Sequence, residues 1–335
     1  MSSHPILLIG GSGVVGRRAA QYLRQAHREL PLLIAGRDLA KARQAAAEIG
    51  GAEGVALDLA ADDLGFSRRP VSAVAVLFTD ERLAGLRFAQ SRGVPYISIS
   101  PLLQEIGPEV GGYIHKPGAA PIILGTEWLV GATTVPTLEF AKAYGRLDSI
   151  SIGALLDDED SGGPAQTVDL ERVTKTGPAA LARQEGRFVW RVGDDATATI
   201  RAVDGTRMEA SALSPNDVVA LAMATGAPNV EFNLATGVSS TRRRGEPMST
   251  EIMIDLAGED PAGRPLSSRH AVVHHDGQFP LTGLGVAMVL ERATGLSGGP
   301  AIPAGLYFPH QLLEPEAYLA RLKQIGGCVL TLDPR

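Results

Sequence analysis

Short apolar runs alternate with longer amphipathic segments over roughly the first 125 residues. A continuous apolar run of about four to eight residues is typical of a strand buried on both faces of a parallel sheet. Six such strands are predicted, at Pro5–Ile9, Pro31–Ala35, Val55–Leu57, Val71–Phe78, Tyr96–Ile99 and Pro121–Leu124. Helices are predicted between them at Val14–Gln25, at Asp38–Ile49, from the N-cap Thr79 to near Gly93, and at Leu102–His115. This alternation predicts an α/β fold with a doubly wound parallel Rossmann sheet.

Beyond about residue 125 the pattern changes to a region dominated by strands. One helix is expected first, at Leu129–Tyr144. Strands are expected at Ile150–Leu155, Arg187–Val192, Thr197–Val203, Thr250–Leu256 and His270–His274. Further helices are expected at Asn216–Thr225, at Thr282–Thr294 with Thr282 as N-cap, and at Pro315–Gln324. The pattern predicts a second domain of mixed α/β (α+β) type.

Composition and charge fit a two-domain globular protein. The chain has 335 residues, of which 44% are hydrophobic and 20% charged. A net charge of −6 opposes attraction to a phosphate backbone, so nucleic acid is not expected as a partner. The one cysteine, Cys328, permits neither an internal disulfide nor a cysteine-based zinc site. The sequence shows no signal-like leader and no long apolar segment, so we expect a cytoplasmic location without membrane contact.

The pattern G-x-G-x-x-G follows the first predicted strand and opens the first predicted helix. Its residues are Gly11, Ser12, Gly13, Val14, Val15 and Gly16. Glycine permits the sharp turn, the close approach of the backbone to a pyrophosphate, and the tight packing of helix on strand. The N–H groups at the helix start favour a phosphate, and the Ser12 hydroxyl is a further donor. In this context the motif predicts a dinucleotide site; a glycine-rich turn of another α/β protein is the alternative.

The end of the second predicted strand distinguishes NADP from NAD. An NAD site usually places an acid about 20 residues after the glycines, where it binds the ribose 2′-hydroxyl. Here the stretch reads Ala35-Gly36-Arg37-Asp38, and the guanidinium of Arg37 suits a 2′-phosphate. NADP is therefore the expected cofactor; NAD, with Asp38 as the acid and Arg37 solvated, is the alternative. Asp58, at the end of the third strand, is a candidate for the adenine amino group or for a simple turn.

Residues after the later strands are candidates for the nicotinamide end of the cofactor site. Phe78 and Thr79 follow the fourth strand, and Ser98 and Ser100 follow the fifth. Glu127 comes directly after the sixth strand and is the candidate general acid or base. A helix-capping role is the alternative for this carboxylate.

Several other chemistries find no support in the sequence. No tyrosine precedes a lysine by four residues, as short-chain reductases require, and no mid-chain cysteine is present for acyl-enzyme chemistry. The G-x-S-x-G pattern at 295–299 follows a predicted helix, so a nucleophile elbow is excluded. His270, His274 and His275 are interpreted as solvated or hydrogen-bonding residues, and no metal is expected. The three arginines at 242–244 are interpreted as a solvated run, with a clamp for a substrate carboxylate as the alternative.

Three segments share the pattern of one known family. They are Ile6–Gly16, Ala35–Arg37, and a C-terminal pattern in which Pro280–Gly283 opens a helix and Gly305–Pro309 precedes Leu319–Gly326. Together they resemble the saccharopine dehydrogenase-like family of NADP-binding oxidoreductases. The resemblance implies a Rossmann domain at 1–126 plus about 296–335, a substrate and dimerisation domain at 127–295, and a homodimer. The chain departs from the family's reductases at 129–131, where an Asp-Pro-Gly with an active-site Asp is replaced by Leu-Val-Gly.

The motif and the resemblance predict an NADP(H)-dependent oxidoreductase with a small-molecule substrate in a cleft between two domains. The resemblance implies reduction of an imine, or oxidation of a secondary amine, in an amino-acid-derived compound. One alternative is a reductase of an activated C=C or C=O bond in secondary metabolism. A second alternative is a dinucleotide-binding sensor without catalytic activity, because the active-site Asp is missing and few acid/base groups stand out.

Overall fold

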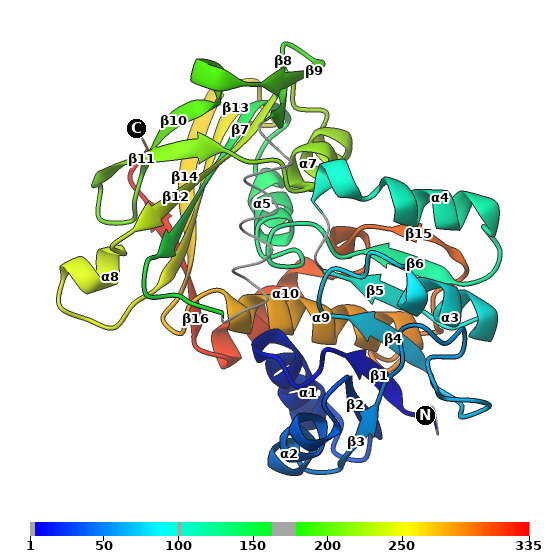
Figure 1. The fold of residues 1–335 in the computed structure, drawn as a ribbon. Helices are drawn as coiled ribbons and strands as arrows, with labels where there is room; N and C mark the ends of the chain where they lie inside the picture. Colours follow the sequence, from blue (N-terminus) through cyan, green and yellow to red (C-terminus); the bar gives the residue numbers. More distant parts are fainter. Residues whose placement is uncertain (1–3, 100–101, 163–178, 335) are drawn as a thin grey trace. The chain divides into compact units, whose positions relative to one another are not determined.

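The computed structural model describes residues 4–99, 102–162 and 179–334, which divide into two compact units (Figure 1). Unit 1 comprises Met1–Thr126 and Thr282–Leu313. Unit 2 comprises Glu127–Leu281 and Glu314–Arg335. Each unit is built around a sheet of its own.

Unit 1 contains a seven-stranded parallel sheet within the described residues. Its order is β15 (Gly305–Tyr307), β6 (Pro121–Leu124), β5 (Tyr96–Ser98), β4 (Ala73–Val76), β1 (Ile6–Ile9), β2 (Leu32–Gly36) and β3 (Ala52–Ala56). The order reverses between β1 and β4, which is where doubly wound sheets bind nucleotides. The predicted doubly wound sheet is therefore confirmed. The returning segment extends it by a seventh strand, β15.

Helices cover both faces of this sheet. In Figure 1, α1 (Val14–Ala26) and α2 (Leu39–Ile49) lie on one side of the strands, and α3 (Ala84–Arg92) and α4 (Gly107–His115) lie on the other. Right-handed crossovers require this division once the strand order reverses. Short 3-10 turns occur at Leu103–Glu105 and Pro309–Gln311. The central strands β1 and β4 are buried along their whole length, as their continuous apolar sequence requires.

The helix predicted to begin at Thr79 begins later. α3 starts at Ala84, and Leu83 before it has a positive φ of 51°. The residues between form a turn that Asp80 holds together, because its carboxylate accepts hydrogen bonds from the N–H groups of Arg82 at 3.2 Å and Gly85 at 2.9 Å. Asp80 therefore provides the acceptor for the free N–H groups in this turn and at the start of α3. The prediction that Thr79 is the N-cap is wrong.

Unit 2 contains a nine-stranded mixed sheet within the described residues. The main path is β10 (Thr197–Arg201), β11 (Arg207–Ala212), β12 (Asn229–Gly237), β7 (Arg146–Asp157), β13 (Thr250–Glu259), β14 (Pro265–His274) and β16 (Gly327–Leu332). A hairpin of β8 (Ala180–Gln184) and β9 (Arg187–Arg191) joins the sheet because β8 pairs with β12. β12 and β7 are parallel, whereas the other neighbours on the path are antiparallel. The expected second mixed domain is confirmed.

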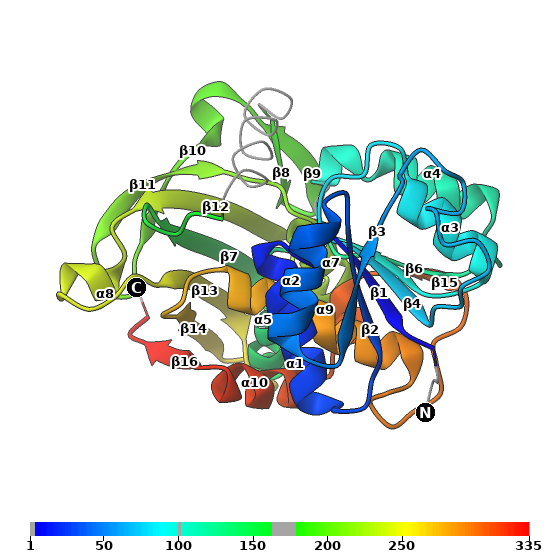
Figure 2. The same ribbon diagram turned by 60° about the horizontal axis from the view of Figure 1, so that its bottom comes forward.

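One face of the second sheet carries three helices. They are α5 (Thr134–Ala141), α7 (Asp217–Thr225) and α10 (Pro315–Gln324), and Figure 1 shows them on the same side of the sheet. A short helix α8 (Ser240–Arg243) follows β12 (Figure 2), and a 3-10 turn at Gly193–Ala196 precedes β10. The apolar positions of β7, β12 and β13 that face these helices are buried, including Ile152, Phe232 and Ile254.

The helix expected over Leu129–Tyr144 is shorter than its sequence pattern indicates. Leu129, Val130 and Gly131 all have positive φ values, of 51°, 57° and 92°, which an α-helix does not permit. α5 therefore begins only at Thr134. Two consecutive non-glycine residues in the left-handed region are costly, so the surrounding structure must hold this turn in place.

The C-terminal segment divides between the units differently from the expected boundary near 296. α9 (Phe279–Thr294) enters unit 1 from Thr282, where Gly283 packs so closely on α1 that a Cβ there would lie 2.6 Å from the Arg18 Cβ. Thr282 lies within this helix and is not its N-cap. Residues 314–335 belong to unit 2, because β16 pairs with β14 over six residues. Among the described residues, no helix is long and apolar enough to cross a membrane.

Candidate functional site

The loop between β1 and α1 is a tight glycine turn. Gly10 has a φ of 82°, and its N–H donates to the Ala35 carbonyl on β2 at 2.9 Å. The Gly11 N–H donates back to the Leu8 carbonyl at 3.1 Å, and the Gly13 N–H donates to the Gly10 carbonyl at 2.9 Å. These bonds turn the chain from the strand into the helix within a few residues.

Two glycines of the motif lie against backbone atoms and leave no room for a side chain. A Cβ at Gly11 would lie 2.8 Å from the Leu8 carbonyl oxygen. A Cβ at Gly16 would lie 2.5 Å from the Gly11 Cα and 2.8 Å from the Gly10 carbonyl oxygen. The first turn of α1 therefore packs directly on the glycine turn, as the third glycine of a dinucleotide motif requires.

The N-terminus of α1 has neither a side-chain cap nor an acidic residue. Gly13 occupies the N-cap position, and Val14 and Val15 form the start of the helix. Val14 is 45% exposed. The first N–H groups of a helix have no acceptor within the helix, and together with the helix dipole they favour an anion. Ser12 lies beside the end of β2, with its Oγ 3.8 Å from the position of a Cβ on Gly36.

Arg37 and Asp38 follow β2 and have different roles. Asp38 is the N-cap of α2, where its Oδ1 accepts hydrogen bonds from the N–H groups of Ala40 at 3.0 Å and Lys41 at 3.1 Å. Arg37 is exposed, and no residue in the described part of the chain pairs with its guanidinium. Asp38 is therefore used as a helix cap, whereas the guanidinium of Arg37 is available to a ligand.

Asp58 lies in a turn just after β3. Its Oδ1 accepts from the Ala60 N–H at 2.8 Å, and its own N–H donates to the Leu64 carbonyl at 3.2 Å. This is an Asx turn, the structural alternative considered for this residue. The side chain is nevertheless exposed at the same edge of the sheet as the glycine turn.

The residues expected at the nicotinamide end follow β4 and β5. Phe78 and Thr79 are half-buried, and the Cδ1 of Phe78 lies 3.2 Å from the position of a Cβ on Gly10, so the ring lies against the glycine turn. Ser98 ends β5 and is 2% exposed. Ser100 lies outside the described residues.

A buried carboxyl that sequence reasoning missed lies beside Ser98. Glu109 on α4 is 2% exposed and accepts a hydrogen bond from the Tyr96 hydroxyl at 2.9 Å. Burial raises the pKa of Glu109, and the hydroxyls of Ser98 and Tyr96 beside it oppose the rise. A single glutamate in a helical pattern is normally a surface residue, so the sequence contains no signal for this position.

Glu127 belongs to a buried polar cluster at the start of unit 2. It is 2% exposed, and its Oε2 accepts from the Thr134 hydroxyl at 2.7 Å. The N–H of the next residue, Trp128, donates to Asp217 Oδ2 at 2.6 Å, which brings a second carboxyl into the cluster. Asp217 is fully buried; burial raises its pKa well above the usual range, and the charge of Glu127 adds to the rise. Sequence reasoning missed Asp217, since about 90 residues separate it from Glu127.

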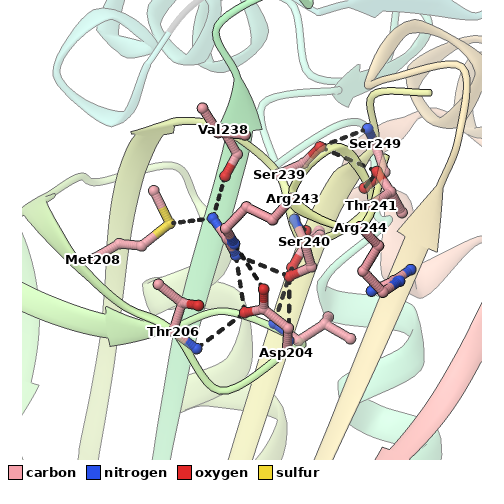
Figure 3. Close-up of polar contacts among 12 residues, drawn as sticks. Asp204, Thr206, Met208, Val238, Ser239, Ser240, Thr241, Arg243, Arg244 and Ser249 are labelled. Carbon is pink, nitrogen blue, oxygen red and sulfur yellow. Dashed lines mark hydrogen bonds and ion pairs between the residues drawn. The ribbon is translucent and has the colours of Figure 1, made fainter. Parts of the chain in front are cut away.

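The three arginines at 242–244 are paired with acidic side chains of unit 2. Their partners are Asp157, Asp158 and Glu159 for Arg242, Asp204 for Arg243, and Glu246 for Arg244. Figure 3 shows the guanidinium of Arg243 between both oxygens of Asp204, at 2.7 and 2.9 Å, and the carbonyl of Val238. These carboxylates pair with all three guanidinium groups, which corrects the expectation of a substrate clamp. Arg244 is exposed, as expected of a solvated run, whereas Arg242 and Arg243 are half-buried.

The Asp204–Arg243 pair should make unit 2 sensitive to acid. The hydrogen bond from Arg243 holds the pKa of Asp204 well below its ordinary value of 3.8, and burial opposes this only in part. Because the folded-state pKa is lowered, the pair stabilises the protein fully above about pH 4 and loses its contribution as the pH falls further. The variant Asp204→Asn should therefore be less stable at pH 7, and its stability should depend less on pH below pH 4.

Urea unfolding at a series of pH values measures this difference. The midpoints of wild type and Asp204→Asn should converge as the pH falls from about 4 towards 2. Asp195→Asn, an exposed carboxylate in the same unit, is the matched control and should follow the wild-type curve. Parallel curves for Asp204→Asn and wild type would contradict the assignment.

His274 and His270 have structural partners. His274 is 2% exposed; its Nδ1 accepts from the Asp276 N–H at 3.1 Å, which leaves Nε2 to donate to the Ile325 carbonyl at 3.0 Å. His270 stacks on Phe140, and burial lowers its pKa. His275 is exposed. Across the described ranges, no group of three or more His, Cys, Asp or Glu side chains is arranged to hold a metal ion.

Comparison with known proteins identifies the fold. No protein-family model matches the chain, and no curated protein sequence matches it either. The solved structure of apo histidine-tagged saccharopine dehydrogenase (L-Glu forming) from Saccharomyces cerevisiae matches with a TM-score of 0.62 at 14% identity, over 99% of this chain and 100% of that chain. This match shows that the two proteins share a fold.

Two further solved structures match less closely. GenD2 from gentamicin A biosynthesis, in complex with NAD, has a TM-score of 0.49 at 13% identity, over 99% of this chain and 97% of that chain. A myo-inositol dehydrogenase from Corynebacterium glutamicum ATCC 13032 has a TM-score of 0.47 at 13% identity, over 100% of both chains.

Proposed function

We propose that unit 1 binds NADP(H) and that the protein is an oxidoreductase that uses this cofactor. The observation that carries the proposal is the uncapped glycine turn between β1 and α1, with the available guanidinium of Arg37 at the end of the neighbouring strand. Carboxyl ends of adjacent parallel strands meet at one edge of the sheet, so the turn and Arg37 share that edge. This edge, at the reversal of strand order, is where doubly wound folds take nucleotides.

The glycine turn fits a pyrophosphate. The N–H groups of Val14, Val15 and Gly16 are the donors we assign to it, and the absence of a Cβ on Gly11 lets the turn pack against β1 and β2. Arg37 is the residue we assign to the 2′-phosphate, since a guanidinium matches phosphate oxygens in a two-point contact. A nicotinamide nucleotide bound here supplies or accepts a hydride.

The remaining candidates follow the same edge of the sheet. Asp58 is assigned to the adenine amino group through the carboxylate oxygen that its turn does not use. Phe78 and Thr79 follow β4, the neighbour of β1, and Ser98 ends β5, the next strand along the sheet; all three are assigned to the nicotinamide end. There they position the ring and exclude water, which is the contribution a protein makes to cofactor chemistry.

The substrate we infer is a small amino-acid-derived molecule that carries an imine, or a secondary amine in the reverse direction. The inference is supported by the fold shared with yeast saccharopine dehydrogenase (L-Glu forming). Reduction of a C=N bond requires one proton at nitrogen, and the buried carboxyl of Glu127 is its proposed source. The active form is proposed to be a homodimer, which sedimentation of the purified protein would test.

The cofactor assignment predicts a selective loss of affinity in Arg37→Ala. A charge-assisted contact to a phosphate contributes about 1.5–3 kcal/mol, so the variant should bind NADPH about 10- to 100-fold more weakly. Its affinity for NADH should not change, because NADH lacks the 2′-phosphate. Calorimetric titration of both nucleotides measures the difference. Arg43→Ala, which removes an exposed arginine from α2, is the matched control and should bind both as wild type does.

Three results would each oppose a part of the proposal. Equal weakening of both nucleotides in Arg37→Ala would reject the 2′-phosphate role. Tight binding of NADPH without its oxidation by any member of a panel of cyclic imines, enones and ketones would favour a nucleotide sensor over an enzyme. Oxidation of NADPH by enones or ketones but not by imines would replace the inferred substrate with an activated C=C or C=O bond.

A further inference from the structure

Three polar side chains of unit 1 are buried together where β5 meets α4. Tyr96 and Ser98 are the first and last residues of β5, and side chains two residues apart in a strand point to the same face. Glu109 belongs to the first turn of α4, and its Oε1 accepts a hydrogen bond from the Tyr96 hydroxyl at 2.9 Å. None of the three is more than 2% exposed. Ser98 brings this group to the carboxyl end of the strand, the edge of the sheet assigned to the nucleotide.

Two oxygen atoms of the group lack partners. Glu109 Oε2 and Ser98 Oγ are both buried, and neither has a hydrogen-bond partner among the residues that the structure describes. The two are nevertheless neighbours, because the Ser98 hydroxyl is close enough to lower the pKa of Glu109. Buried polar atoms without partners are rare in folded proteins and point to a bound water, a ligand or a functional role. Hydrogen bonds of binding sites are often long before the ligand is bound and shorten afterwards.

The surroundings of Glu109 favour its protonated form. Burial raises the pKa of Glu109, the hydroxyls of Ser98 and Tyr96 oppose the rise, and the charge of Asp80 adds to it. Asp80 lies in the turn before α3, where its Oδ2 is 3.6 Å from the position of a Cβ on Gly85. The ring carbon Cε2 of Tyr96 lies 3.5 Å from the same position, so the second carboxylate and the tyrosine ring lie on one side of the helix start.

Other charged groups on the elements around Glu109 have roles elsewhere. Glu105 accepts a hydrogen bond within its own 3-10 turn. Arg87 and Arg92 on α3 donate to backbone carbonyl groups outside α4. His115, at the far end of α4, is exposed. In the described part of the chain, no lysine, arginine or histidine is among the groups that shift the pKa of Glu109.

The proton of Glu109 decides which way the Ser98 hydroxyl points. In a protonated carboxyl, Oε1 accepts from the Tyr96 hydroxyl while Oε2 donates to Ser98 Oγ. The hydroxyl hydrogen of Ser98 is then left to donate to a ligand. An ionised carboxyl reverses the arrangement, because Ser98 must donate to Oε2 and can offer a ligand only an acceptor.

We propose that Glu109 is a positioning residue of the nicotinamide end, which directs the Ser98 hydroxyl to donate to the carboxamide oxygen of the nicotinamide ring. This inference rests on the proposed function, because it requires a nicotinamide nucleotide in unit 1. All the residues that it uses belong to that unit. Glu109 itself does not touch the nucleotide and acts through Ser98 alone.

The 3-acetylpyridine analogue of NADP⁺ tests the direction of this hydrogen bond. A carboxamide has a donor as well as an acceptor and can turn over to suit either state of Ser98, whereas the acetyl group has only an acceptor. The wild type should therefore bind the analogue more weakly as the pH rises from 5 to 8.5 through the pKa of Glu109. The loss should be about 2- to 10-fold, the value of one hydrogen bond, in calorimetric titrations.

Glu109→Gln is the conservative variant that should remove this pH dependence. Its amide oxygen accepts from Tyr96, and its NH₂ group donates to Ser98 Oγ at every pH. The phosphates of the analogue titrate equally in both proteins, so the ratio of the two affinities isolates Glu109. Ser98→Ala should bind the analogue about 2- to 10-fold more weakly than Glu109→Gln at every pH. Glu29→Gln, which changes an exposed glutamate of the same unit, is the control and should follow the wild type.

The proton on Glu109 can also be observed without nucleotide. Infrared difference spectra of wild type minus Glu109→Gln should contain the carbonyl stretch of a buried carboxylic acid, which disappears only above the ordinary glutamate pKa of 4.5. Tyr96→Phe should shift this disappearance to higher pH, since the Tyr96 hydroxyl lowers the pKa of Glu109. A residue that serves packing alone would show neither effect.

The possible failures can be told apart. A missing infrared band, or a wild-type to Glu109→Gln affinity ratio that stays constant from pH 5 to 8.5 while NADPH binds tightly, would reject only the role of Glu109. A folded protein that shows the band but takes up no nicotinamide nucleotide would overturn the cofactor proposal, and the inference with it.

Discussion

Gly16→Ala should weaken nucleotide binding about 100-fold and destabilise unit 1. The added methyl group would lie 2.5 Å from the Gly11 Cα and 2.8 Å from the Gly10 carbonyl oxygen. These are backbone atoms of the tight turn, so the overlap can be relieved only if α1 moves away from β1. Overpacking of this kind costs about 1–3 kcal/mol of stability. The displaced helix would also lose two charge-assisted N–H contacts to a pyrophosphate. This loss should weaken binding by about 3 kcal/mol, which corresponds to about 100-fold in affinity.

Thermal unfolding and calorimetric titration with NADPH measure both effects. Gly111→Ala is a matched control, because Gly111 lies within α4 of the same unit and a Cβ there would meet nothing within 4 Å. Alanine is the better helix former, so this variant should be as stable as wild type or more so. Gly16→Ala with wild-type stability and affinity would show that the helix does not pack on the turn as described.

Glu251→Gln should be among the most destabilising substitutions in unit 2. Glu251 is 0% exposed, and its two oxygens accept three hydrogen bonds: from the N–H of Ser240, from the N–H of Val203 at 2.9 Å and from the Ser240 hydroxyl at 2.8 Å. A glutamine has one acceptor oxygen, and its NH₂ group would face donors on the other side. Buried donors without acceptors should cost about 3 kcal/mol.

For a unit of this size the loss corresponds to a decrease in Tm of roughly 6–12 °C. Calorimetric unfolding would measure it. Glu246→Gln, which affects only the exposed ion pair with Arg244, is the control and should show no measurable change. If Glu251→Gln unfolds at the wild-type temperature, the buried hydrogen bonds of Glu251 do not contribute as the geometry indicates.

Unit 1 was predictable because its signals are local. The central strands β1, β2, β4 and β6 are continuous apolar runs, and the glycines that the turn requires follow β1 directly. β3 at the sheet edge reads AEGVA and begins before the predicted Val55–Leu57. Asp38 was considered as a ribose ligand, yet the structure engages it as the N-cap of α2. The sequence pattern places Arg37 and Asp38 correctly at the end of the strand. Only the hydrogen bonds show that Asp38 is used in capping and that Arg37 is available to a ligand.

The second half was less predictable because its strands depend on partners far away in the chain. β11 alternates between exposed and half-buried positions, so its sequence lacks a strong apolar pattern. The segment at about 296–335 was expected in the first domain, but only its part up to Leu313 lies in unit 1, and its last strand, β16, pairs with β14 of unit 2. The helix pattern at Leu129–Tyr144 was interrupted by three residues with positive φ, a conformation that apolar periodicity does not reveal.

By itself, then, the sequence determined the parallel sheet, the glycine turn and the position of Arg37, because each depends on residues that are neighbours in the chain. Only the tertiary structure decided that Asp217 lies beside the peptide after Glu127, that Glu109 is buried next to Ser98, and that the three arginines are occupied by acids of their own unit. The physical reason is the same in each case. Burial and the proximity of charges determine what a carboxylate or a guanidinium can do, and both arise from residues that folding brings together from distant parts of the chain.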